Sequence, residues 1–415
     1  MIVKPFRGLR PRSDLATKIP SVPYDVVNAE EARRLAADDP YSFLHVIRAE
    51  IDLDPAMDPF DERVYAQGGA RFRSMIEQGW LVRDSTPAYY VYRLQMGNHT
   101  QTGIVGAAAV GDYLEGRIKK HEHTRPDKEQ DRVRVIEALG AHPGPVFLTY
   151  PGVEELNQEV AAVVRRDPAV SFAATDGVEH TLWVEDDVER CRRIEDLFGR
   201  IPATYVADGH HRAAAAATAC SGVCDKLDSS TGDESCHYFL TVHFPANEVR
   251  VLDYNRVVRD RNGHAADALL QKIGEAGFDI EIDHAEKRPP LRGTFGMYLA
   301  GRWYLLSAKD VPQGDLLGGL DVSVLAGRVL RPILGIEDPR TDGRIDFVGG
   351  IRGMQELERR VDSGESAVAF ALYLTSLEDL MRVADAGEVM PPKSTWFEPK
   401  LRSGLVVQLL DDDLL

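Results

Sequence analysis

Five consecutive residues, Asp208-Gly209-His210-His211-Arg212, combine side chains and backbone groups that suit phosphate binding. They follow the short apolar run 203–207 and precede the alanine-rich run 213–217, a pattern that predicts a strand, a tight turn and a helix. The first N–H groups of a helix have no partner within it, and the helix dipole is positive there, so such a turn can bind an anion. The two imidazoles and the guanidinium add donors for phosphate oxygens.

Asp208 is the one acidic residue of this turn, and the sequence leaves its role open. It could orient a histidine, bind a metal ion or accept a proton. In the alternative interpretation, Asp208 is a plain N-cap and the two histidines are surface residues. We favour a functional turn, because binding residues gather on loops that a rigid scaffold positions.

A second stretch, residues 119–132, is the most basic part of an acidic chain. Local positive charge of this kind can hold a polyphosphate. His121 and His123 flank Glu122, but they would point the same way only on a strand, so a metal site is a weak prediction. A solvated charged helix is the alternative. The residues of this stretch that we expect to bind phosphate or nucleotide are Lys120, His121, His123, Thr124, Arg125, Lys128 and Arg132.

The third stretch, residues 390–404, places a lysine and hydroxyl groups after two prolines that stiffen the backbone. Such a loop could contact phosphate or a Mg²⁺-bound water, although the glycine spacing of a P-loop is absent. The alternative is a structural loop anchored by Trp396 and Phe397. The residues that we expect to close the site are Lys393, Ser394, Thr395 and Lys400.

The cysteines Cys220, Cys224 and Cys236, with His237, are four potential zinc ligands. Their spacing differs from the usual paired C-x2-C pattern, so we expect core or surface thiols instead. The four cysteines of the 415-residue chain are too few for a disulfide scaffold, which favours a reducing, cytoplasmic location. We see no targeting segment and no apolar run near the roughly 20 residues of a membrane span.

The chain carries 49 lysine and arginine residues against 66 aspartate and glutamate residues, a formal net charge of −17. An acidic surface repels nucleic acid and anionic membranes, so we expect neither as a partner. An anionic metabolite remains compatible with this charge if a local basic cleft binds it. The oligomeric state is open, with a homodimer as one option.

Strand-like and helix-like segments alternate along the chain, which predicts a mixed α+β fold. Residues 88–96 and 102–110 are strand-like and are separated by a turn, and such hairpins argue against a purely parallel sheet. We expect an N-terminal α/β region over residues 1–247 that carries the basic stretch and the Asp208 turn. An inserted α+β module would follow over 248–338, and a C-terminal segment, 339–415, would pack back on the first region.

The chain resembles the domain-of-unknown-function family 1015 in the segments 23–27, 121–132, 207–212 and 393–404. The D-G-H-H-R turn before an alanine-rich helix is also similar to the phosphate-binding motif of the ParB/sulfiredoxin-like superfamily. That superfamily includes partition proteins, sulfiredoxin and free-serine kinases. The resemblance implies a ParB/sulfiredoxin-like phosphate-binding core and phosphoryl transfer that involves serine or phosphoserine. Sulfiredoxin's cysteine is absent from the turn, which argues against sulfinic-acid reduction.

The leading hypothesis is a Mg²⁺-dependent kinase of a small hydroxy amino acid, with L-serine favoured and ATP or ADP as the phosphate donor. Such an enzyme relies on positioning and charge neutralisation. We expect Asp25, Asp208 and His211 to be catalytic, and Gly209, His210 and Arg212 to bind phosphate with the basic stretch. A phosphoserine phosphatase, and a ParB-like protein that senses a nucleotide or metabolite, remain alternatives.

Overall fold

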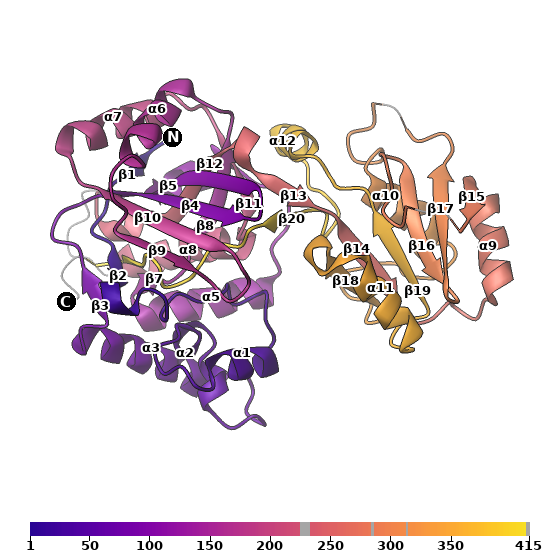
Figure 1. Cartoon of the computed structure of the whole chain (residues 1–415), viewed down its shortest axis with the longest axis horizontal. Coiled ribbons are helices and arrows are strands. Elements are labelled where there is room, and N and C mark those ends of the chain that lie inside the picture. Colours follow the sequence, from indigo (N-terminus) through magenta and orange to yellow (C-terminus); the bar gives the residue numbers. More distant parts are fainter. Residues whose placement is uncertain (225–232, 284–285, 313, 412–415) are drawn as a thin grey trace. The chain divides into compact units, whose positions relative to one another are not determined.

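The computed structural model describes residues 1–224, 233–283, 286–312 and 314–411 (Figure 1). The chain divides into two compact units, the first made of Met1–Val249 and Pro399–Leu415 and the second of Arg250–Glu398. Both units contain helices and strands, which confirms the predicted mixed α+β class. No helix within the described ranges is long and apolar enough to cross a membrane.

A mixed sheet forms the centre of the first unit. In their order across the sheet, its strands are β6 (Ile118–Lys119), β11 (Thr204–Asp208), β8 (Val146–Tyr150), β12 (Tyr238–Pro245), β5 (His99–Ala109), β4 (Tyr89–Met96), β10 (Glu179–Glu185) and β9 (Val170–Ala173), and β1 (Val3–Lys4) pairs with β5. β11 runs parallel to β6, and β12 runs parallel to β8. The predicted hairpin is confirmed as β4 and β5, which pair antiparallel.

In Figure 1, α6 and α7 lie on one side of this sheet, and α1 and α3 lie on the other side, beyond α5. The helices of the unit are α1 (Ala29–Ala36), α2 (Leu44–Ile47), α3 (Glu62–Glu77), α4 (Val110–Leu114), α5 (Pro126–Leu139), α6 (Glu154–Val163), α7 (Val188–Gly199) and α8 (His210–Cys224). The 3-10 turns are η1 (Ser13–Leu15), η2 (Ala49–Asp52), η3 (Ser235–His237) and η4 (Ala246–Glu248). Two short ladders join β2 (Leu9–Pro11) to β3 (Leu81–Arg83), and β7 (Ala141–His142) to β21 (Gln408–Leu409).

Helices α5 and α8 pack against each other through a small apolar cluster. Ala215 and Ala219 of α8 lie in one buried cluster with Val133 and Ile136 of α5. Small side chains on α8 let the two helices approach closely. The N-terminal ends of the two helices meet as well, because the backbone N–H of Arg125, the N-cap residue of α5, donates to His211 of α8. This arrangement positions the candidate site.

The second unit contains its own sheet, in which neighbouring strands are antiparallel. Its strands in order are β15 (Phe278–Ile282), β17 (Arg302–Ala308), β16 (Thr294–Leu299), β19 (Val368–Leu372), β14 (Tyr254–Val258) and β18 (Ile345–Gly349). A separate ladder joins β13 (Arg250–Leu252) to β20 (Trp396–Glu398). The helical segments are α9 (Ala266–Glu275), α10 (Asp321–Leu325), η5 (Ala326–Leu330), η6 (Gly350–Arg352), α11 (Gly353–Asp362) and α12 (Leu377–Asp385).

This division differs from the boundary that the sequence suggested near residue 339. Strands β18 and β19 follow that position, yet they flank β14 within the second sheet. Segment 339–398 therefore belongs with 250–338, and Pro399–Leu415 is the part that returns to the first unit. The pattern of apolar residues indicates that a segment is a strand, but it does not say which strand lies beside it.

Candidate functional site

The Asp208 turn forms as a strand, a single glycine and a helix. β11 ends at Asp208, and α8 begins at His210. Gly209 has φ of +97°, and a Cβ added there would lie 3.0 Å from Nε of Arg212. Only glycine adopts this backbone conformation without strain. The turn therefore brings the Arg212 guanidinium close to the backbone at Gly209, just before α8 begins.

Two cations surround the Asp208 carboxylate. Nζ of Lys400 lies 3.1 Å from Oδ2 of Asp208, and Nη2 of Arg212 lies 3.8 Å from Oδ1. Burial alone would raise the pKa of Asp208, but the charges of Lys400 and Arg212 hold that pKa well below its ordinary value. Asp208 is therefore ionised at neutral pH and is a weak proton acceptor.

Arg212 is the buried cation of the turn. Its Nη1 donates to the backbone oxygen of Pro145, and its buried Nε has no hydrogen-bond partner within the described residues. Burial opposes the charged guanidinium, yet the nearby carboxylates of Asp25 and Asp208 raise the pKa of Arg212. The unpartnered Nε is a donor that a bound anion could satisfy.

The imidazoles of the turn attach the basic stretch to α8. The backbone N–H of Arg125 donates to Nε2 of His211 at 3.1 Å, and that of His121 donates to Nε2 of His210 at 3.5 Å. The rings of His121 and His210 are nearly perpendicular, with centroids 4.4 Å apart. Because Nε2 of His210 accepts, its Nδ1 carries the proton in the neutral ring.

Burial keeps the paired imidazoles of His121 and His210 neutral. It lowers the pKa of His121 to about 4 and the pKa of His210 well below the ordinary value. These rings therefore supply hydrogen bonds, without positive charge, near neutral pH. In the structure, the ring of His210 holds the backbone of His121, which lies 89 positions earlier in the chain, and phosphate binding by His210 stays a prediction.

The rest of the basic stretch surrounds the N-terminus of α5. Arg125 is its N-cap residue and pairs with Asp127 at 2.9 Å, and Thr124 donates to Glu129 at 2.9 Å. Lys120 lies over the ring of Tyr113, while the side chain of His123 is exposed.

The ring nitrogens of His121 and His210 and a carboxylate oxygen of Glu122 lie within 4.8 Å of one another. Two imidazoles suit zinc better than Mg²⁺, which prefers oxygen ligands.

A cavity of about 280 Å³ is lined by residues of α5 and by residues between Tyr24 and Gly68. Arg132 lines it, pairs with Asp131 at 2.6 Å and places its guanidinium 3.7 Å from the centre of the Tyr24 ring. A smaller cavity of about 30 Å³ shares Tyr24 and Arg132 with it and is also lined by Arg212 of the turn. The aromatic and charged groups that line the larger cavity suit a small polar ligand.

Sequence reasoning missed two charged residues of this cavity, Arg48 and Glu50, which pair at 2.9 Å. Arg48 lies between α2 and η2, Glu50 belongs to η2, and no motif marks those segments. Lys128 of the basic stretch also lines the cavity. The nearness of Arg48 and Glu50 to Arg132 depends on how the α2–α3 region packs on α5, which local sequence does not encode.

The third stretch divides between the two units. Lys400 belongs to the first unit and contacts the turn. Lys393, Ser394 and Thr395 belong to the second unit. There, the backbone oxygen of Lys393 accepts from Arg256 at 3.0 Å, and the buried hydroxyl of Ser394 donates to the backbone oxygen of Pro391 at 2.6 Å. Their expected role in closing the site stays a prediction.

Several solved structures are similar to the chain, at low sequence identity and low TM-score. A mutant free serine kinase in complex with AMP is 12% identical, with a TM-score of 0.36, over 71% of this chain and 87% of the kinase. A conserved hypothetical protein from Pyrococcus furiosus is 14% identical, with a TM-score of 0.36, over 73% and 94%. SbnI with a C-terminal truncation, from Staphylococcus aureus, is 14% identical, with a TM-score of 0.40, over 74% and 90%.

Among curated protein sequences, none matches this chain. The family model described as a protein of unknown function, DUF1015, matches residues 3–323, which is well over half of the chain. This match confirms the resemblance that the sequence motifs suggested, and the chain belongs to the DUF1015 family.

Proposed function

We propose that the protein is a nucleotide-dependent phosphotransferase that phosphorylates a small hydroxy amino acid, with free L-serine favoured and O-phosphoserine as the product. The observation that carries this proposal is the meeting of two helix N-termini, those of α5 and α8, through the contact of Arg125 with His211. Each helix N-terminus carries roughly half a positive charge. With Arg212 and Lys400 beside them, these groups can neutralise a phosphoryl group in transfer.

The charges of the turn suggest a separate role for each of its residues in the proposed reaction. The backbone N–H groups after Gly209 and the Nε of Arg212 bind phosphate oxygens. Asp208 stays ionised beside Lys400, so it orients these cations and is a poor base. Asp25 is exposed and close enough to Arg212 to act on its charge, which makes Asp25 the better candidate to accept the hydroxyl proton.

We expect Mg²⁺ to bind at the carboxylates of this site. Asp25 and Asp208 both act on the charge of Arg212, and both offer the hard oxygen ligands that Mg²⁺ prefers. When bound there, the ion would neutralise charge on the nucleotide phosphates. The roughly 280 Å³ cavity lined by Lys128 and Arg132 would accept the rest of the nucleotide or the carboxylate of the amino acid.

In the proposed reaction, the substrate hydroxyl oxygen attacks the terminal phosphorus of the nucleotide. The new P–O bond forms as the bond to the leaving phosphate oxygen breaks, and Asp25 takes the hydroxyl proton. Serine as the favoured substrate rests on the resemblance of the D-G-H-H-R turn to that of free-serine kinases, because the geometry by itself indicates only phosphate.

Product analysis tests this proposal. The purified chain is incubated with Mg²⁺, L-serine and ATP, ADP or CTP in turn, and phosphoserine is measured by mass spectrometry. We expect phosphoserine with at least one nucleotide, and a rate about 100-fold lower in Arg212→Ala, because a donor to the transferred phosphoryl group is lost. Arg192→Ala is the matched control, since Arg192 is an exposed residue of α7.

Three results would count against a kinase. Release of phosphate from phosphoserine without nucleotide would indicate a phosphatase. Tight nucleotide binding without any product would indicate a sensing protein. Equal activity in Arg212→Ala and the unaltered chain would move the reaction away from the Asp208 turn.

A further inference from the structure

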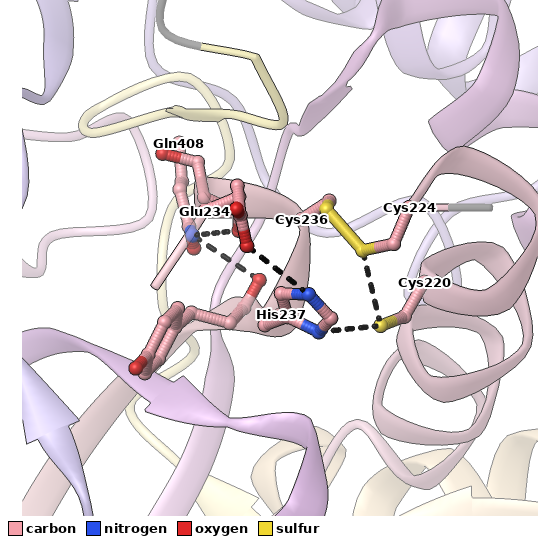
Figure 2. The surroundings of a disulfide bond; sticks show 8 residues. Cys220, Cys224, Glu234, Cys236, His237 and Gln408 are labelled. Atoms are coloured by element: carbon pink, nitrogen blue, oxygen red, sulfur yellow. Dashed lines mark hydrogen bonds and ion pairs between the residues drawn. A yellow bond between two sulfur atoms is a disulfide. The ribbon is translucent and has the colours of Figure 1, made fainter. Parts of the chain in front are cut away.

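Four side chains of zinc-ligand type converge where α8 ends, far from the Asp208 turn (Figure 2). Cys220 and Cys224 lie one helical turn apart, on the same face of α8. The turn η3 brings Cys236 and His237 beside them. Cys224 and Cys236 form a disulfide, which corrects the expectation of plain thiols at these two positions.

The disulfide accounts for only two members of this group. Sγ of Cys220 lies 3.6 Å from Sγ of Cys224 and 3.9 Å from Nδ1 of His237. A tetrahedral zinc ion with ordinary bond lengths would separate two sulfurs by about 3.8 Å, and a sulfur and a nitrogen by about 3.6 Å. The distances from Cys220 therefore already match those of a zinc site.

A carboxylate supports the histidine from its other side. Oε2 of Glu234 lies 3.3 Å from Nε2 of His237, so the ring turns Nδ1 toward the sulfurs and Nε2 toward a carboxylate. Zinc-binding histidines usually have such a carboxylate or carbonyl partner, which fixes the ring and raises its basicity. Gln408 anchors the same turn by donating to the backbone oxygens of Ser235 and Tyr238, at 3.4 and 3.2 Å. A disulfide needs none of these contacts.

We infer that the reduced protein binds one zinc ion through Cys220, Cys224, Cys236 and His237, and that the disulfide is the oxidised, metal-free form of the same site. A dithiol reductant converts the disulfide to two thiols and is itself oxidised to a disulfide. Zinc then binds three thiolates and one neutral imidazole, and three protons leave the cysteines.

The zinc site has a structural role. Four protein ligands complete a tetrahedral shell and leave no position for a substrate, as in closed structural sites. The ion ties the end of α8 to η3 and thus to the start of β12. Cys224 is 14 residues from His210, so the site lies about 20 Å along α8 from the phosphate turn. It is therefore independent of the proposed phosphotransferase reaction.

Metal analysis of the whole chain tests this inference. The protein is purified under reducing conditions, its thiols are titrated, and its zinc content is measured by elemental analysis. We expect four thiols, matching the four cysteines of the sequence, and about one zinc ion per chain. Cobalt added to the metal-free, reduced chain should give the absorption bands of a tetrahedral thiolate complex.

Variants separate a built site from adventitious binding. Cys220→Ser and His237→Ala should lose the zinc, and Glu234→Gln should bind it about 10 to 100-fold more weakly. Cys191→Ser is the matched control, because Cys191 is a buried thiol of α7 that donates to the backbone oxygen of Glu185. Circular dichroism checks that each variant is folded.

The inference fails if the fully reduced chain binds no zinc, or if folded Cys220→Ser and His237→Ala bind it as tightly as the unaltered chain. It also fails if the disulfide persists in the presence of a dithiol reductant and zinc together. None of these results depends on the phosphotransferase assay, so the two proposals can fail separately.

Discussion

Replacing Gly209 with alanine tests whether the backbone of the Asp208 turn is required. The φ of +97° at this position costs a non-glycine residue about 1–3 kcal/mol. The new Cβ would also lie 3.0 Å from Nε and 3.1 Å from Cζ of Arg212, so the guanidinium must move by a few tenths of an ångström. We therefore expect Gly209→Ala to lower the free energy of unfolding by about 1–3 kcal/mol.

The same change should weaken nucleotide binding, because Arg212 moves away from the N-terminus of α8. A loss of about 1.4 kcal/mol corresponds to a tenfold weaker affinity, which we take as the expected minimum. Urea denaturation measures the free energy of unfolding, and calorimetric titration with ATP or ADP measures affinity.

Gly222→Ala on the same helix is the control for this substitution. Its added Cβ would meet only Oε1 of Glu137, at 3.7 Å, which is an ordinary contact. Alanine also favours a helix over glycine, by up to about 1 kcal/mol. If Gly209→Ala behaves like Gly222→Ala in both measurements, the argument that this turn requires glycine and positions Arg212 is wrong.

Two further predictions concern charge in and around the turn. Lys400→Ala should lower the free energy of unfolding at pH 7 by about 1–3 kcal/mol, because Asp208 loses its closest cation. The pKa of Asp208 is depressed in the folded state, so this contribution is present above about pH 4 and is lost as the pH falls below it. Denaturation at pH 7 and pH 3 checks this, and an equal deficit at both values would contradict it. Burial lowers the pKa of His121 to about 4, so the unfolded chain binds more protons and stability should fall as the pH drops from about 6.5 to about 4. His121→Asn should make that fall shallower, by up to about 3 kcal/mol across the range.

The local features of this protein could be predicted from the sequence. The strand, glycine and helix around Asp208, and the hairpin of β4 and β5, follow from residue preferences within about ten positions of the chain. The match of the DUF1015 family model likewise agrees with short motifs that are visible in the sequence.

The tertiary structure decided which of these segments meet. The Arg125 N–H reaches His211 because small alanines of α8 let α5 pack closely beside it, and no local preference encodes that approach. Cys220 and His237 also meet only in the folded chain. Helix α8 determines which way the Cys220 side chain faces, and η3 determines the position of His237. Sequence determined the residue types and the local backbone, whereas burial of distant apolar surfaces determined the neighbours, and with them the pKa values and the possible ligands.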